Sequence, residues 1–99
     1  GGDYFALTLE RGSTIPVRLR ITDASGATVT AFTGPVTLTA ELTSAALPST
    51  ITANAVAGVV EFQYPLPATY TGPARFRATA TLNGTATTAL GNVFSVVMP

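Results

Sequence analysis

The 99-residue chain contains no cysteine, no histidine and no tryptophan, all five of its cationic residues are arginine, and only 10% of its residues are charged. Without cysteine, the chain can form neither a disulfide nor a thiolate-ligated zinc site, so packing and hydrogen bonding must stabilise it. Without histidine or lysine, a serine or threonine lacks the usual neighbouring base, which excludes the familiar catalytic triads. We therefore expect no enzymatic activity, no catalytic residue, no metal site and no cofactor.

The charges balance, because five arginines are matched by five aspartates and glutamates. A net charge of zero gives no strong electrostatic attraction for nucleic acid or for an anionic membrane. No apolar run approaches the roughly 20 residues that a membrane-spanning helix needs. We therefore expect neither nucleic-acid binding nor membrane insertion.

A chain of this length has room for one hydrophobic core. It begins with Gly1-Gly2-Asp3 rather than with methionine, which suggests processing or excision from something longer. We expect a single domain over residues 1–99 that forms part of a longer chain or assembly.

Short apolar alternations separated by glycine, proline and asparagine indicate an all-β protein. No window shows sustained helical periodicity, although 44–46 or 50–56 could hold one helical turn. The expected strands are 4–9, 15–22, 29–32, 36–42, 59–64, 74–82, and a last strand that begins after residue 84 and ends with 93–97.

The clearest alternation lies in segment 15–22, where every second residue is a large aliphatic. Period two places these residues on one face of a strand, toward the core. Leu19 is the middle of this set, so we expect it to be fully buried. The following Asp23-Ala24-Ser25-Gly26 indicates a turn, in which the aspartate bonds to nearby backbone.

About seven short strands in a chain of this length favour an immunoglobulin-like sandwich of two antiparallel sheets. A small barrel is the alternative.

The Asn83-Gly84 dipeptide is a strong hairpin signal, and we favour this reading over its role in an N-glycosylation sequon with Thr85. A two-residue turn would pair Leu82 with Thr85, Ala80 with Thr87 and Ala78 with Ala89. Odd-numbered positions of the last strand would then face the core.

The apolar pair at the end of that strand, however, is even-numbered: Phe94 and Val96. We therefore expect a β-bulge at residues 90–92, where Gly91 would permit the backbone angles. The alternatives are a three-residue loop with a bulge at Gly84, or a core formed by Val93 and Val97 instead.

Two arginine pairs are candidate binding residues, because outward guanidinium groups can recognise carboxylates or sulfates. These are Arg18 with Arg20, and Arg75 with Arg77. The simpler interpretation is that they pair across strands with Glu61 and Glu41, respectively.

Tyr70, in a loop rich in proline and glycine, is the best candidate for stacking on a sugar. A calcium site at Asp23 is less favoured than the turn, because calcium takes 6–8 oxygen ligands.

Several motifs together resemble the filamin-type and bacterial immunoglobulin-like (Big-like) repeat domains of surface or virion proteins. They are Phe32-Thr33-Gly34-Pro35-Val36-Thr37-Leu38, Gly58-Val59-Val60-Glu61-Phe62 and Gly91-Asn92-Val93-Phe94-Ser95-Val96. The resemblance implies tandem arrangement and a role as spacer, stalk, adhesin or accessory domain, and it brings no catalytic residues.

We therefore expect a non-catalytic structural module of an extracellular, cell-surface or virion assembly: a repeat, stalk, fibre or decoration subunit. Its expected partners are proteins, through self-assembly or neighbouring domains. The alternative is a binding module for carbohydrate or protein, possibly accessory to an enzyme. The apolar segments 4–9 and 93–98 carry no lysine or inward charge to protect an edge strand, so we expect contacts there.

Overall fold

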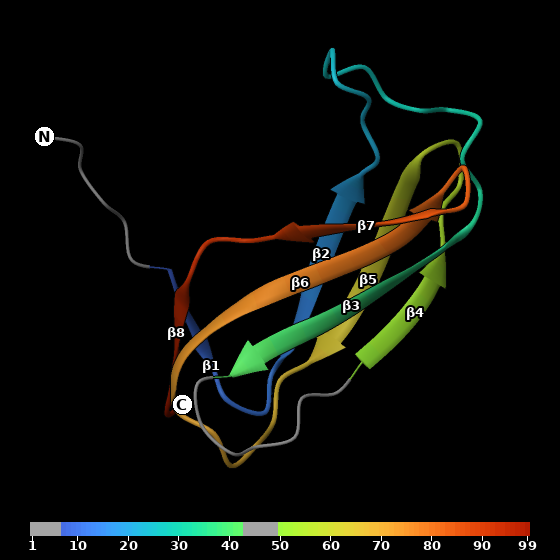
Figure 1. Cartoon of the computed structure of the whole chain (residues 1–99). Helices are drawn as coiled ribbons and strands as arrows, with labels where there is room; N and C mark the ends of the chain where they lie inside the picture. Colours follow the sequence, from blue (N-terminus) through green and yellow to red (C-terminus); the bar gives the residue numbers. More distant parts are fainter. Residues whose placement is uncertain (1–6, 43–49) are drawn as a thin grey trace, which may run out of the picture.

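A computed structural model describes residues 7–42 and 50–99 of the chain. These residues form eight strands in two sheets and contain no helix, as Figure 1 shows. The strands are β1 (Thr8–Glu10), β2 (Thr14–Arg20), β3 (Pro35–Leu42), β4 (Thr50–Asn54), β5 (Val59–Pro65), β6 (Gly72–Leu82), β7 (Thr85–Leu90) and β8 (Phe94–Val97). The all-β class and the two-sheet arrangement predicted from the sequence are confirmed.

The two sheets differ in size. The larger has the order β1-β8-β6-β3-β4, with β7 also paired to β6, and the smaller contains only β2 and β5. Strand β6 is long enough to serve two partners: its first residues pair with β8 and its last residues with β7. In Figure 1, β2 and β5 lie behind the long strands β3 and β6.

The core lies between the sheets, where strands β3 and β5 contribute alternate residues. The most deeply buried large side chains include Leu38, Val36, Val60 and Tyr64. The ring of Phe76 packs edge-on against Tyr64, with ring centroids 5.2 Å apart, and also contacts Phe94 at 5.2 Å. The described residues contain no buried polar or charged residue. Apolar packing between two sheets therefore holds this core.

Leu19 is only half-buried, so our expectation of full burial was wrong. Its strand faces the core as predicted, since Ile15, Val17 and Leu19 pack against the buried cluster. Strand β2, however, pairs only with β5 and has no second neighbour in its sheet. A strand at the edge of a sheet leaves its inward side chains partly open to solvent. The alternation identified the face but not the position of the strand.

The Asn83-Gly84 hairpin is confirmed. Asn83 has φ of 51° and Gly84 has φ of 81°, the two positive values that a type I′ turn requires. The register is the expected one, with Leu82 opposite Thr85, Ala80 opposite Thr87 and Ala78 opposite Ala89. The alternative three-residue loop is therefore wrong.

The predicted change of face before β8 is also present. Two residues of β6 separate the partners Ala74 and Arg77, whereas three residues separate Phe94 and Leu90 opposite them. This one extra residue turns Phe94 and Val96 into the core, while Val93 is 65% exposed. A core formed by Val93 and Val97 is therefore ruled out.

The extra residue falls slightly later than we expected. Gly91 still donates its N–H to the Phe76 carbonyl at 2.8 Å, in register with β7, so the change occurs at Asn92 and Val93. Gly91 does not adopt a positive φ. The conformational freedom of glycine is therefore not what permits the change.

Two segments differ from the sequence-based prediction. Residues 29–32, expected as a strand, form a turn in which Phe32 donates its N–H to the Val29 carbonyl at 3.1 Å. Segment 50–56, considered for a helical turn, instead contains strand β4. The other helical candidate, 44–46, and residues 4–6 of the expected first strand lie outside the described residues.

The two terminal strands pair with each other. Strand β1 lies parallel to β8, with Leu9 opposite Val96. Ser95 donates its N–H to the Leu7 carbonyl at 3.0 Å, and Arg11 donates its N–H to the Val97 carbonyl at 2.8 Å. Strand β8 lies between β1 and β6 and is therefore not an edge strand, and contacts of the terminal segments with a partner stay a prediction.

Candidate functional site

The candidate arginines on β2 behave differently from each other. Arg18 lies directly opposite Glu61 of β5, with 3.7 Å between Arg18 Nε and Glu61 Oε1. Both side chains are exposed, so this predicted cross-strand pair is confirmed but adds little stability. Arg20 shares the outward face of β2, and no ion pair joins it to any described residue. Anion binding by Arg20 stays a prediction.

Arg75 and Arg77 both bind one carboxylate, that of Glu41. Arg75 Nε lies 2.9 Å from Glu41 Oε2, and Arg77 Nε bonds the other oxygen, Oε1. Strands β3 and β6 place these side chains together, since Glu41 is directly opposite Arg75. The Arg77 and Arg75 hydrogen bonds hold the pKa of Glu41 below its ordinary value. The predicted pairing is confirmed, and it occupies one nitrogen of each guanidinium.

Tyr70 lies in the loop before β6, as the sequence suggested, but its side chain is only 4% exposed. Its hydroxyl donates to the Pro73 carbonyl at 2.6 Å. Gly72 lies beside the ring, because a Cβ there would come within 3.0 Å of the hydroxyl oxygen. The ring is thus part of the core and is not available for stacking on a sugar.

Asp23 closes the predicted turn. Its Oδ1 accepts hydrogen bonds from Ser25 Oγ at 2.6 Å, from Ser25 N at 2.9 Å and from Ala27 N at 3.1 Å. These bonds, led by the Ser25 hydroxyl, lower the pKa of Asp23. The described residues contain no group of three or more acidic, histidine or cysteine side chains that could hold a metal ion. Asp23 is therefore best understood as a turn residue.

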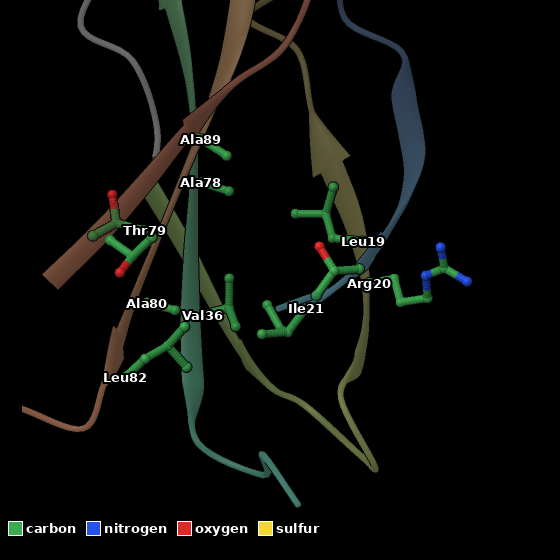
Figure 2. Close-up of a pocket in the computed structure, with 11 residues that line it drawn as sticks. Leu19, Arg20, Ile21, Val36, Ala78, Thr79, Ala80, Leu82 and Ala89 are labelled. Atoms are coloured by element: carbon green, nitrogen blue, oxygen red, sulfur yellow. The ribbon is translucent and has the colours of Figure 1, made fainter. Parts of the chain in front are cut away.

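A hollow that no sequence pattern predicted lies between the two sheets beside β7. Figure 2 shows Leu19 and Ile21 of the β2 side facing Ala78, Ala80 and Leu82 of β6 across this space. Its volume is about 280 Å³. We call it the β7 hollow; its lining residues are Leu19, Arg20, Ile21, Thr22, Val36, Ala78, Thr79, Ala80, Leu82, Thr87 and Ala89.

The β7 hollow is mainly apolar. Arg20 is the one charged residue of its lining, and the guanidinium points away from the space in Figure 2. A hollow of this size lies just below the range of about 300–1,000 Å³ for small-molecule sites, and it offers no converging polar groups. Residues at the end of β2 and just after it line one side of the hollow, and small residues of β6 and β7, Ala78, Ala80 and Ala89, line the other.

No helix in the described ranges is long and apolar enough to cross a membrane. No family model matches the chain, and comparisons with curated proteins and with solved structures also give no match. The fold and these surfaces are therefore the basis for any functional proposal.

Proposed function

We propose that this chain is a non-catalytic, immunoglobulin-like structural module of an extracellular or virion surface assembly, which holds neighbouring parts apart under load. The observation that carries the proposal is the parallel pairing of the terminal strands, with β1 beside β8.

The distribution of strands between the sheets supports the immunoglobulin-like part of the proposal. In that fold, the second and fifth strands share one sheet, and the third, sixth and seventh share the other. Here β2 pairs with β5, while β3, β6 and the β7–β8 segment lie together in the other sheet. This division supports an immunoglobulin-like arrangement for five of the strand positions, whereas β1 and β4 lie in the larger sheet and not with β2 and β5.

The terminal pair supports the load-bearing part. Because β1 and β8 run in the same direction, a pull on the two ends of the domain draws them apart along their length. The bonds from Ser95 N to Leu7 O and from Arg11 N to Val97 O then resist together, rather than one after another. Phe94 and Val96 anchor β8 in the core. This arrangement suits a module that transmits force between its neighbours.

Single-molecule pulling tests the proposal. The chain has no cysteine, so cysteine handles can be placed at chosen points without competing thiols. We expect a clearly higher unfolding force when the handles are at the two ends than when one is at the C-terminus and the other at Thr14. Thr14 is exposed and follows β1 at the end of the β1–β8 pair where the C-terminus lies, so that pull separates the two strands one bond after another. Forced unfolding reports the rate of unfolding directly. Equal forces in the two geometries would overturn the load-bearing role.

A matched pair of variants at Ser95 sharpens this test. Ser95→Pro removes the N–H that bonds Leu7, whereas Ser95→Ala keeps it, and the side chain is exposed in both cases. We expect the end-to-end unfolding force to fall in Ser95→Pro and to stay unchanged in Ser95→Ala.

The alternative role in carbohydrate binding has less support. Tyr70 is buried, and Arg75 and Arg77 already share a carboxylate.

A further inference from the structure

Strand β7 is the least supported element of the fold. All six of its residues are exposed, and it pairs with β6 alone. Its sequence, Thr-Ala-Thr-Thr-Ala-Leu, contains neither a charge nor a proline. Natural proteins usually protect an edge strand with such residues, and β2 does so with Pro16, Arg18 and Arg20. The edge of β7 therefore lacks the usual protection against pairing with another strand.

The free hydrogen-bonding groups of this edge can be assigned. In an antiparallel ladder, alternate residues bond to the neighbouring strand. Gly91 donates its N–H to Phe76, so the odd-numbered residues Thr85, Thr87 and Ala89 point their backbone groups toward β6. The even-numbered residues, 86, 88 and 90, point theirs away from β6. Three N–H groups and three carbonyls thus form an open ladder edge.

The free edge is complementary to itself. If two copies pair antiparallel with Thr88 opposite Thr88, Ala86 of each copy lies opposite Leu90 of the other. In this register a small side chain meets a large one that is 49% exposed in the single domain. The free backbone N–H and carbonyl groups of all three even-numbered residues would then be hydrogen-bonded. The bonded pairs are 86 with 90, 88 with 88, and 90 with 86.

We propose that β7 is a self-association edge, through which two copies of this chain join their larger sheets about a two-fold axis at Thr88. Charge favours a second copy as the occupant, because β7 is neutral and two such strands meet without like-charge repulsion. A two-fold pairing keeps the faces of the joined sheets aligned, so the two β7 hollows would lie on the same face of the joined sheet. The interface is isologous and closes after two copies.

The proposal names the partner for the structural role above and rests on it, but the two are tested separately. Pulling measures the terminal strands of one domain, whereas association measures β7. Association without mechanical strength would refute the load-bearing role and leave self-association through β7 standing. Mechanical strength without association would do the opposite.

Amide hydrogen exchange gives a readout specific to the register. In a dilute sample, the N–H groups of Ala86, Thr88 and Leu90 point to solvent and should exchange fast, while those of Thr87 and Ala89 are bonded to β6. As the concentration is raised, we expect the even-numbered amides to become protected, in step with a shift from monomer to dimer in sedimentation. A monomer at all concentrations, or a dimer in which these three amides stay fast, would overturn the proposal.

Charge substitution at the two-fold position tests the pairing directly. Thr88→Lys and Thr88→Asp each place like charges opposite each other in a homodimer, so each variant alone should remain monomeric. Mixed in equal amounts, they should form a heterodimer, because the opposite charges then meet at the axis. The mixture also controls for folding, since an unfolded variant could not restore association.

Thr52→Lys is the matched control, because Thr52 is exposed on β4, at the other side of the same sheet. It adds the same charge without touching β7, and the dimer should persist. Loss of the dimer in Thr52→Lys with its retention in Thr88→Lys would place the interface on β4 and refute the assignment.

Discussion

The phenol oxygen of Tyr64 accepts the backbone N–H of Ala40 at 2.9 Å, and this bond joins the two sheets through the core. Tyr64 belongs to β5 and Ala40 to β3. Ala40 lies just beyond Thr39, whose pairing with Thr50 is the last between described residues of β3 and β4. The phenol thus satisfies a backbone donor at the point where that described ladder stops.

Replacing Tyr64 by phenylalanine should therefore destabilise the fold by about 1–3 kcal/mol, because the buried Ala40 N–H loses its acceptor while the ring packing is kept. Denaturant titration measures the change. Phe62→Leu, in the same strand, removes no hydrogen bond and serves as a packing control. An unchanged free energy of unfolding in Tyr64→Phe would show that the bond contributes nothing.

Burial also raises the pKa of Tyr64, despite the opposing hydrogen bond from Ala40. A group whose pKa is higher in the folded state favours folding while it stays protonated. The unfolded chain begins to ionise near the ordinary tyrosine value of about 10. Stability should therefore fall as the pH rises beyond about 10, and this fall should be smaller in Tyr64→Phe. Parallel pH profiles for the two proteins would contradict this linkage.

The position of Leu19 at the edge of the smaller sheet changes what its truncation should cost. Leu38 is fully buried in β3, so Leu38→Ala should cost about 2–5 kcal/mol. Leu19 is half-buried and borders the β7 hollow, so Leu19→Ala should cost roughly 1–2 kcal/mol. Equal losses in the two variants, measured by the same titration, would mean that β2 is as well covered as β3.

Two glycines with similar backbone angles should respond differently to alanine. Gly58 and Gly84 have φ of 80° and 81°, respectively. A Cβ at Gly84 meets nothing within 4 Å, so Gly84→Ala should cost only the backbone strain, roughly 1 kcal/mol. A Cβ at Gly58 would lie 2.5 Å from the Val29 carbonyl oxygen, so Gly58→Ala should cost more, about 2–4 kcal/mol. Thermal unfolding of both variants decides whether the contact adds to the strain.

Deleting Asn92 tests the extra residue before β8. The deletion restores equal spacing opposite β6, so Phe94 and Val96 would turn to the outside of the sheet. We expect a large loss of stability or failure to fold, whereas Asn92→Ala should change the free energy of unfolding by less than about 0.5 kcal/mol. A deletion variant as stable as Asn92→Ala would show that the change of face has no energetic importance.

The sequence predicted those features that local chemistry determines. Asn83-Gly84 specified the turn, the turn specified the register of β7, and the conflict with Phe94 then revealed the extra residue. The cross-strand partners of Arg18 and Arg75 also followed from the expected strand arrangement. Features that depend on strand neighbours did not follow, because alternation shows which face of β2 is apolar but not that β2 is an edge strand.

Weak local signals explain the remaining errors. Strand β4 is short and alternates only Ile51 and Ala53 with polar residues, so its pattern is hard to distinguish from a turn of helix. The pairing of β1 with β8 joins the two ends of the chain and leaves no local pattern. The β7 hollow forms between β2, β6 and β7, which are far apart in the sequence, so the small residues Ala78, Ala80 and Ala89 mark it only after the strand order is known.

The extra residue between β7 and β8, at Asn92 or Val93, separates two segments that differ in how they are held in the fold. Phe94 and Val96 tie the second segment to the core, so it can open only when the domain unfolds. The hairpin segment, residues 83–90, is held mainly by its bonds to β6 and can detach in a local opening. New sequence could therefore be inserted at the Asn83-Gly84 turn, or residues 83–90 could be substituted, without disturbing Phe94 and Val96, which hold β8 to the core.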